Sequence, residues 1–311
     1  MGHGTWTVFV FCRRSLMAGV LTGKAALVTG SSRGIGRAIA RRLASEGATV
    51  VVTARSKQPS TSTRGGQALM VGGSLDETVA LIEAAGGKAV AIAADLEDPA
   101  ARDSLVDKVV DELGGIDILV NNAGFADYSV IADMEMETFD RTVDHYLRVP
   151  FALSKTAIPY MRKAGAGWIV NIGSSTGLSP IRPFREYNKD SGDVIYAAIK
   201  AAQHRFTQGL AAELIDDNIA VNSVGPSTAI MTPGAQALLP EGYETEPVEF
   251  LAETVLQMSH LPAAERTGLV TFSLHFPQHE GLTVMSLDGK TPLPPVEPPA
   301  WTNPNILPAG L

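Results

Sequence analysis

The stretch that decides the fold is residues 25–36, which read Ala-Ala-Leu-Val-Thr-Gly-Ser-Ser-Arg-Gly-Ile-Gly. A short apolar run, Ala25 to Thr29, leads into a turn that carries glycine at three of its next seven positions. A helical pattern of apolar residues then continues through Leu43, and the β-branched run Thr49 to Thr53 follows. This order predicts a βαβ unit, and therefore two neighbouring parallel strands.

Beyond this unit, strand-like and helix-like patterns alternate without a break. Such alternation predicts a single α/β domain of the Rossmann type, a doubly wound parallel sheet with helices on both faces. We expect further strands at residues 88–94, 116–120, 168–172, 219–224, 269–274 and 282–287, and helices at residues 75–85, 105–113, 139–162 and 196–214.

The chain has 311 residues, which is more than the ~250 that one large α/β domain needs. We place the domain at residues 21–290, including a substrate lid at about 228–258. The excess lies in four pieces. Residues 1–20 are expected to be a disordered leader or the product of an upstream start site, residues 56–74 and 182–193 are inserted loops, and residues 291–311 are a proline-rich tail.

The tail cannot be helical, because 7 of the 19 prolines fall in residues 292–308. Two arrangements remain open for it. The tail either lies across a neighbouring subunit or frays at the end of the chain.

Composition excludes several classes of function. The net charge is −8 with no long run of Lys or Arg, so the sequence offers no face for nucleic acid. The single cysteine, Cys12, cannot form an internal disulfide. The apolar segment Trp6 to Phe11 is too short to span a membrane and makes a poor signal peptide, so we expect a cytoplasmic protein without a membrane partner. No metal site is predicted, because Pro277 argues against a helix that presents His275 and His279 together.

The glycine-rich turn favours a dinucleotide cofactor. Glycines between a strand and a helix let the backbone approach a pyrophosphate, whose charge the helix N-terminus stabilises. At the end of the second strand an acidic residue would repel a 2′-phosphate, but Ala54 and Arg55 stand there. Arg33 in the turn offers a second guanidinium. We therefore predict that NADP(H) is preferred over NAD(H).

Tyr196 and Lys200 stand four residues apart on one face of a predicted helix. A nearby ammonium favours the phenolate and so makes a tyrosine a better acid-base group at neutral pH. The pair is common by itself, and its meaning comes from the motifs that accompany it.

Together these motifs resemble the short-chain dehydrogenase/reductase family over about residues 21–289, most closely its 3-oxoacyl-thioester reductases and related hydroxy-dehydrogenases. The matching pieces are residues 29–36, Asp95-Leu96, Asn121-Asn122-Ala123-Gly124, Ser174, Tyr196 with Lys200, and Val221-Asn222 leading to Pro226.

The resemblance implies roles for individual residues. Tyr196 would donate a proton to the substrate oxygen, Lys200 would hold the nicotinamide ribose, and Ser174 would position the substrate, with Ser175 as its competitor for that role. Asn121 would brace the central strand. The implied cofactor-binding residues are Gly30, Ser32, Arg33, Gly34, Ile35, Gly36, Arg55, Asp95, Leu96, Asn122, Ala123, Gly124, Tyr196, Lys200, Pro226 and Thr232.

One position departs from the family pattern: Tyr146 stands where the family has a catalytic asparagine. The resemblance assigns that position a proton-relay water held largely by the backbone carbonyl, which a tyrosine keeps. We interpret the Tyr146 side chain as packing.

The sequence thus predicts an NADPH-dependent oxidoreductase that transfers hydride between nicotinamide and a carbonyl or secondary alcohol of a moderately apolar substrate. Two alternatives remain: a reductase of 3-oxoacyl thioesters carried on ACP or CoA, and a nucleotide-binding protein with little catalysis. The family resemblance also implies a homodimer or homotetramer.

Overall fold

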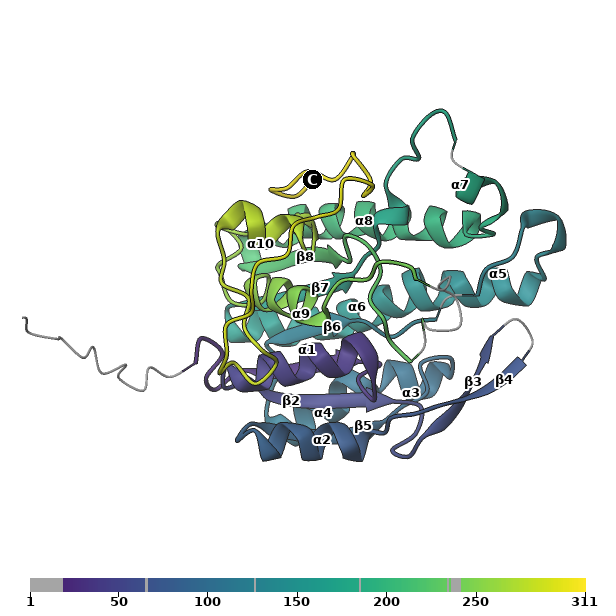
Figure 1. Cartoon of the computed structure of the whole chain (residues 1–311). Coiled ribbons are helices and arrows are strands. Elements are labelled where there is room, and N and C mark those ends of the chain that lie inside the picture. The colour runs from purple at the N-terminus through teal and green to yellow at the C-terminus, as the bar shows by residue number, and fades with distance from the viewer. Residues whose placement is uncertain (1–18, 65–66, 126, 185, 234, 236–241) are drawn as a thin grey trace, which may run out of the picture.

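The computed structural model describes residues 19–311 apart from 65–66, 126, 185, 234 and 236–241. The predicted leader therefore lies almost wholly outside the described residues. Within them, seven parallel strands form one sheet in the order β5-β2-β1-β6-β7-β8-β9 (Figure 1). The strands are β1 (Ala25–Thr29), β2 (Thr49–Ala54), β5 (Lys88–Ala93), β6 (Ile118–Asn121), β7 (Gly167–Ile172), β8 (Ile219–Gly225) and β9 (Val270–Phe272). The predicted doubly wound parallel sheet is confirmed.

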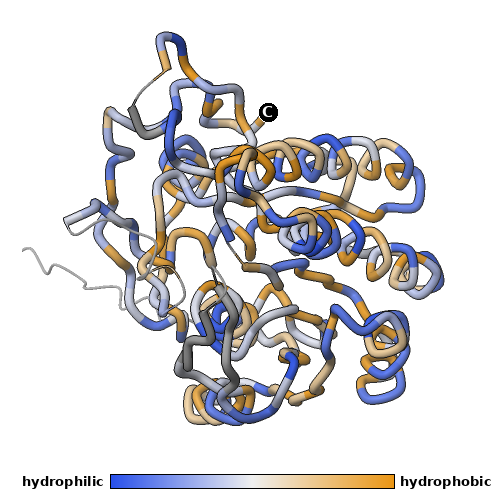
Figure 2. Tube along the Cα trace, turned by 90° about the vertical axis from the view of Figure 1, so that its right-hand side faces the viewer, coloured by the Kyte–Doolittle hydropathy of each residue, from blue (hydrophilic) through white to orange (hydrophobic). Residues whose placement is uncertain are grey.

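Helices cover both faces of this sheet because successive strand residues point to opposite sides. In β1, Ala26 and Val28 join the apolar core under one layer of helices, and Leu27 joins the core under the other. Figure 2 shows apolar segments between the layers and hydrophilic turns outside. The first layer contains α1 (Gly34–Ser45), α2 (Leu75–Ala84) and α9 (Val248–Gln257); the second contains α4 (Leu105–Leu113), α6 (Val149–Ala164) and α8 (Val194–Leu214).

Shorter elements lie at the ends of these layers. They are the helices α3 (Pro99–Asp103), α5 (Met136–Val143), α7 (Glu186–Asp190) and α10 (His275–Glu280), and the antiparallel strands β3 (Ser60–Arg64) and β4 (Gln67–Val71). The β3–β4 hairpin is the form that the inserted segment at residues 56–74 takes. It projects beyond the carboxyl ends of the parallel strands, on the same side as α7 (Figure 1).

Three sequence-based expectations differ from the structure. The predicted helix 139–162 is divided, because a π-helical segment at residues 144–148 separates α5 from α6. The strand predicted at 282–287 is absent from this described stretch, where Met285 makes only an isolated bridge to Pro292. Residues 275–280 do form a helix, because Pro277 stands in its first turn, where backbone N–H groups need no helical partner.

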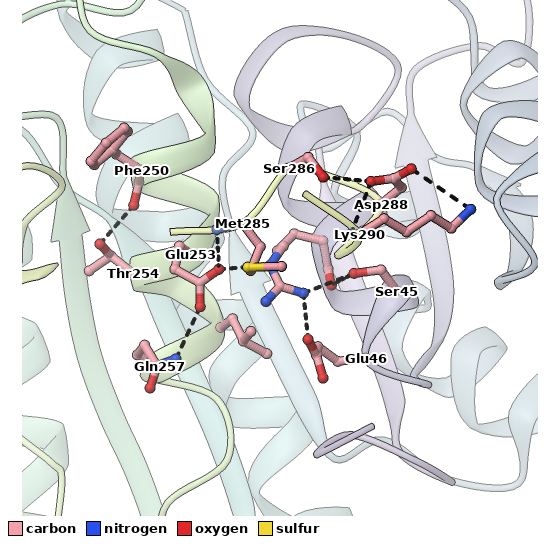
Figure 3. A network of polar contacts seen from close by, with 12 residues as sticks. Ser45, Glu46, Phe250, Glu253, Thr254, Gln257, Met285, Ser286, Asp288 and Lys290 are labelled. Atoms are coloured by element: carbon pink, nitrogen blue, oxygen red, sulfur yellow. Dashed lines mark hydrogen bonds and ion pairs between the residues drawn. The ribbon is translucent and has the colours of Figure 1, made fainter. Parts of the chain in front are cut away.

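A buried ion pair joins α1 to α9 and to the turn that follows α10. The Arg42 Nε atom lies 2.8 Å from Glu253 Oε2, and both side chains are 3% exposed. The Met285 backbone N–H also donates to Glu253, which Figure 3 shows beside the turn at Ser286 and Asp288. Because a buried charge is costly without a partner, this pair fixes how α9 sits on α1.

The proline-rich tail packs against its own chain. Val270 and Leu311 exchange backbone hydrogen bonds of 3.3 and 3.1 Å at β9, which is the edge strand of the sheet. Ile306 is only 6% exposed and lies in a small core with Val270 and Phe272. Of the two arrangements left open by the sequence, the frayed end does not describe these residues, because the tail is held along the edge strand of its own chain.

Candidate active site

One cavity of about 1170 Å³ opens at the carboxyl ends of the parallel strands. This edge is where a doubly wound sheet binds its ligands, because the strand order reverses there. Every catalytic or cofactor-binding residue predicted from the sequence lines this cavity. The structure therefore brings the whole predicted set together.

The glycine-rich turn has the geometry of a pyrophosphate cradle. Gly30 and Gly34 have φ angles of +66° and +54°, which side chains rarely adopt. A Cβ atom on Gly36 would lie 2.4 Å from the Gly30 carbonyl oxygen and 2.5 Å from Asn122 Nδ2, so only glycine fits. At the N-cap of α1, Arg33 makes no side-chain capping bond, and no acidic residue stands in the first turn. The positive end of α1 therefore fits a bound anion.

Two arginines line the cavity near the glycine-rich turn and the end of β2. β2 ends at Ala54, and Arg55 and Arg33 line the cavity beside it. The Arg37 guanidinium donates to the Ser32 carbonyl oxygen at 2.6 Å and to Glu77 at 2.8 Å, and Arg37 does not line the cavity. Arg33 in the turn and Arg55 directly after β2 are therefore the arginines that line the cavity here.

Thr29 and Asn122 fasten the end of β6 to the glycine-rich turn. The Thr29 Oγ1 atom accepts from the backbone N–H groups of Asn122 and Ala123, both at 2.9 Å. The Asn122 side chain donates in turn to the Thr29 carbonyl oxygen at 2.7 Å. Asn121 instead donates to buried Asn171 at 2.9 Å, joining β6 to β7, so its side chain contributes to the sheet.

Lys200 is held inside the cavity wall by carbonyl oxygens. It is 2% exposed, and its Nζ atom donates to the Ile172 carbonyl oxygen at 2.5 Å and to Gln203 Oε1 at 3.1 Å. Burial lowers the pKa of this ammonium group to about 7. The ring of half-buried Tyr196 lies 5.6 Å from Nζ, so the two members of the Tyr-Lys pair face one another across one turn of α8.

Tyr146 contacts both members of this pair. Its ring centroid lies 4.0 Å from Lys200 Nζ and 5.3 Å from the Tyr196 ring, which it meets edge to face. Its hydroxyl donates to the Phe125 carbonyl oxygen. A Cβ atom on Gly124 would lie 2.5 Å from the Tyr146 ring, so glycine makes room for it. The side chain sits in the π-helical segment, and its ring face stabilises the Lys200 cation.

Ser174 is backed by residues that the sequence analysis did not single out. Its Oγ atom lies 2.9 Å from Thr176 Oγ1, and its backbone N–H donates to His204 Nε2 at 3.4 Å. Burial and the charge of Lys200 lower the His204 pKa to about 4, which keeps this ring neutral and able to accept. The signal in the sequence was the four-residue spacing from Lys200 to His204 on α8.

The far end of the cavity is apolar and comes from three separate segments. They are the loop between β7 and α8, the segment after β8, and the tail. Of the predicted lid at 228–258, residues 248–257 form α9, whose Phe250 and Leu251 are buried in the core and do not reach the cavity. Apolar and aromatic residues on this wall are Leu178, Ile181, Phe184, Val194, Ile230, Tyr243 and Trp301.

In the described part of the chain, no group of three or more His, Cys, Asp or Glu side chains could hold a metal ion. The same residues contain no helix that is both long and apolar enough to cross a membrane.

His275 Nδ1 lies 2.9 Å from Ser227 Oγ, and burial lowers the pKa of the His275 ring.

The family model for short chain dehydrogenases matches residues 24–241, so the chain belongs to the short-chain dehydrogenase/reductase family. Its members are NAD(P)-dependent oxidoreductases that act on small molecules. The resemblance seen in the sequence is thereby confirmed.

Particular relatives extend the match. The human hydroxysteroid dehydrogenase-like protein 2 is 30% identical over 282 residues. The match covers 90% of this chain but only 63% of the length of the human protein. An uncharacterized oxidoreductase from Thermotoga maritima is 37% identical over 66% of this chain and 72% of its own length. Among solved structures, a short chain dehydrogenase from Mycobacterium thermoresistibile has a TM-score of 0.73 at 28% identity, covering 93% of this chain and 99% of its own. A hydroxysteroid dehydrogenase from Escherichia coli has a TM-score of 0.64 at 27% identity, covering 81% of this chain and 96% of its own.

Proposed function

We propose that this chain is an NADPH-dependent oxidoreductase that interconverts an apolar ketone and its secondary alcohol. One observation carries the proposal: a single cavity joins the glycine-rich turn, the Tyr-Lys pair and an apolar wall. The cofactor, when bound, supplies or accepts the hydride. The residues of the chain bind the two reactants, orient them and move one proton.

Tyr196 is the proton donor in the direction of ketone reduction. Its ring lies at the cavity surface between Tyr146 and Tyr128, whose ring is 5.4 Å away. The Lys200 ammonium near it stabilises the phenolate that remains after proton transfer. Ser174 holds the substrate oxygen near the Tyr196 hydroxyl, which positions the carbonyl carbon for hydride transfer. Ser174 is buried and its hydroxyl contacts Thr176, whereas Ser175 is less buried, and both observations support Ser174 in this role.

Arg33 and Arg55 set the cofactor preference. Both line the cavity at the end of β2, where no carboxylate stands to accept a ribose hydroxyl. A guanidinium binds a phosphate through two parallel hydrogen bonds, so the 2′-phosphate of NADPH gains contacts that NADH lacks.

The apolar wall favours a ketone on a hydrocarbon frame. Phe184 and Tyr243 are 52% and 38% exposed, so they offer apolar surface to a ligand. The hydroxysteroid names of the human and Escherichia coli relatives point to the same chemistry. We also propose a cytoplasmic homodimer or homotetramer, which analytical ultracentrifugation of the purified chain would test.

The test is steady-state reduction of decalone, acetoacetyl-CoA and acetone with NADPH and with NADH. We expect kcat/KM for decalone to exceed that for the other two, and to be about tenfold or more higher with NADPH than with NADH. Faster turnover of acetoacetyl-CoA would favour the thioester reductase instead. Equal kcat/KM with both cofactors would refute the NADPH preference.

A further inference from the structure

The proline-rich tail forms part of the catalytic cavity. Trp301, Thr302 and Asn303 line the same cavity as Tyr196 and Lys200, although they follow the last strand of the sheet. The family match ends at residue 241, so the tail lies beyond the part of the chain that the family model describes. The role of the tail follows from its contacts with the rest of this chain.

Two asparagines tie the tail to the segment directly after Ser174. The Asn303 Nδ2 atom lies 3.5 Å from the carbonyl oxygens of both Ser175 and Ser179. Asn305 Nδ2 donates to the same Ser179 oxygen at 2.9 Å. The asparagine side chains of the tail therefore position it relative to Ser174 through backbone carbonyl oxygens of the β7–α8 loop.

Hydrophobic contacts fix the tail from its other end. Ile306 is buried against Val270 and Phe272, with Leu178 of the cavity wall packed on the same small core. Figure 1 shows the C-terminus close to α8, and Gln208 of that helix contacts the Leu311 carbonyl oxygen at 3.5 Å. Trp301 thus precedes an anchored segment, which limits how far it can move.

Trp301 packs against Tyr243, which belongs to the segment that follows β8. The two ring centroids lie 5.5 Å apart with an interplanar angle of 70°, and Trp301 Nε1 donates to Glu244 Oε2 at 3.1 Å. Trp301 remains 37% exposed and Tyr243 38% exposed. The tail and the post-β8 segment therefore meet in an aromatic pair that still has uncovered surface at the cavity.

We propose that Trp301 and Tyr243 form a substrate-binding wall that selects flat, multi-ring apolar ketones and alcohols over small ones. The proposal rests on the proposed function, because the wall is defined by its place in the cavity of Tyr196. A ligand whose carbonyl sits at Tyr196 gains binding energy in proportion to the apolar area that it buries. A one-ring ketone buries too little area to use both the loop wall and this aromatic pair, whereas a fused-ring ketone reaches both.

The test compares Trp301→Ala and Trp301→Phe on cyclohexanone, decalone and a saturated steroid ketone. Leu307→Ala is the matched control, because Leu307 is an exposed tail residue that does not line the cavity. For Trp301→Ala we expect kcat/KM to fall about tenfold or more on the steroid ketone, mostly through KM, and to change less than about twofold on cyclohexanone. Trp301→Phe should fall between wild type and Trp301→Ala. An equal fall on all three ketones, or no fall, would overturn the proposal.

A binding measurement separates this proposal from the proposed function. Equilibrium dialysis of the labelled steroid ketone against the NADPH-loaded protein requires no turnover. We expect weaker binding to Trp301→Ala than to wild type and Leu307→Ala, even if no ketone were reduced. Equal affinity of all three proteins, or no binding to wild type, would overturn the wall whether or not the enzyme is active on other substrates.

Discussion

The two ends of the cavity are built in different ways. The cofactor end comes mainly from the carboxyl ends of β1, β2, β5 and β6 and from the turns directly after them, so its residues are close in sequence to the strands that place them. The substrate end comes from the β7–α8 loop, the post-β8 segment and the tail, which meet only in the folded chain. The first end depends on backbone geometry and the second on side-chain contacts.

This difference indicates where each property of the enzyme is set. Glycines in the turn and hydrogen bonds such as that of Asn122 to Thr29 leave the cofactor end little freedom. The substrate end uses long, exposed side chains that lie outside the sheet, among them Phe184 and Trp301. Substitutions at the first end should therefore alter cofactor use, and those at the second should alter substrate choice.

Tyr196 stands where the two ends meet, and its loss should have the largest effect. Because the Tyr196→Phe protein lacks the proton donor, we expect kcat to fall about a hundredfold to ten-thousandfold. The NADPH dissociation constant, measured by fluorescence titration, should change little. Tyr160→Phe is the control, since Tyr160 bonds to Asp107 on the surface of the second helical layer. A kcat for Tyr196→Phe within threefold of wild type would rule out its role.

The paired change Arg33→Ala with Arg55→Ala tests the cofactor end by itself. Losing two guanidinium contacts to the 2′-phosphate should lower kcat/KM for NADPH by about tenfold to a hundredfold, and leave that for NADH within about twofold. The ratio of kcat/KM for steroid ketone and cyclohexanone should stay as in wild type. Arg162→Ala, which removes a surface arginine paired with Asp217, is the control. An equal loss of kcat/KM with both cofactors would mean that these arginines do not bind the 2′-phosphate.

Tyr146 tests whether the departure from the family pattern has a function. Removing the ring in Tyr146→Leu should lower kcat by about threefold to thirtyfold, because the Lys200 cation loses its contact with the ring face. Tyr146→Phe keeps the ring and should stay within about threefold of wild type. Stopped-flow reduction of decalone at saturating NADPH measures both. If the two variants lose activity equally, the hydroxyl and its bond to Phe125 matter and the ring face does not.

The burial of Lys200 should have a smaller effect, which appears as a change in the free energy of unfolding with pH. Its folded pKa of about 7 lies below the usual lysine pKa of 10.5 because the group is buried. Between these values the unfolded chain binds more protons than the folded chain, so the free energy of unfolding gains up to about 1.4 kcal/mol per pH unit as pH rises. Urea unfolding of wild type and Lys200→Met should therefore show their difference moving in favour of wild type from about pH 7 to 9. A difference that is constant with pH would contradict this.

The sequence predicted that the residues of the cofactor end would lie together, because its signals are local. Gly30, Gly34 and Gly36 are required by turn geometry within a few residues, and the strands before Asp95 and Asn122 are continuous apolar runs. The same reasoning failed at residues 282–287, where an apolar run packs beside α9 without joining a ladder.

The substrate end could not be predicted to the same degree. Nothing local in the tail shows that Trp301 would meet Tyr243, since the contact depends on the anchoring of Ile306 in a separate core. The contact of Tyr146 with Lys200 likewise depends on the π-helical segment, which the apolar pattern of one long helix did not reveal.

The most direct test of the proposed hydride transfer is a single turnover of decalone with NADPH that carries deuterium at both C4 positions of the nicotinamide. Mass spectrometry of the product alcohol should find one deuterium on the carbinol carbon with wild-type protein. The Tyr196→Phe protein should form the same labelled alcohol about a hundredfold more slowly or worse. If folded, NADPH-saturated wild-type protein transferred no deuterium to decalone or to the steroid ketone, the proposed reaction would be contradicted.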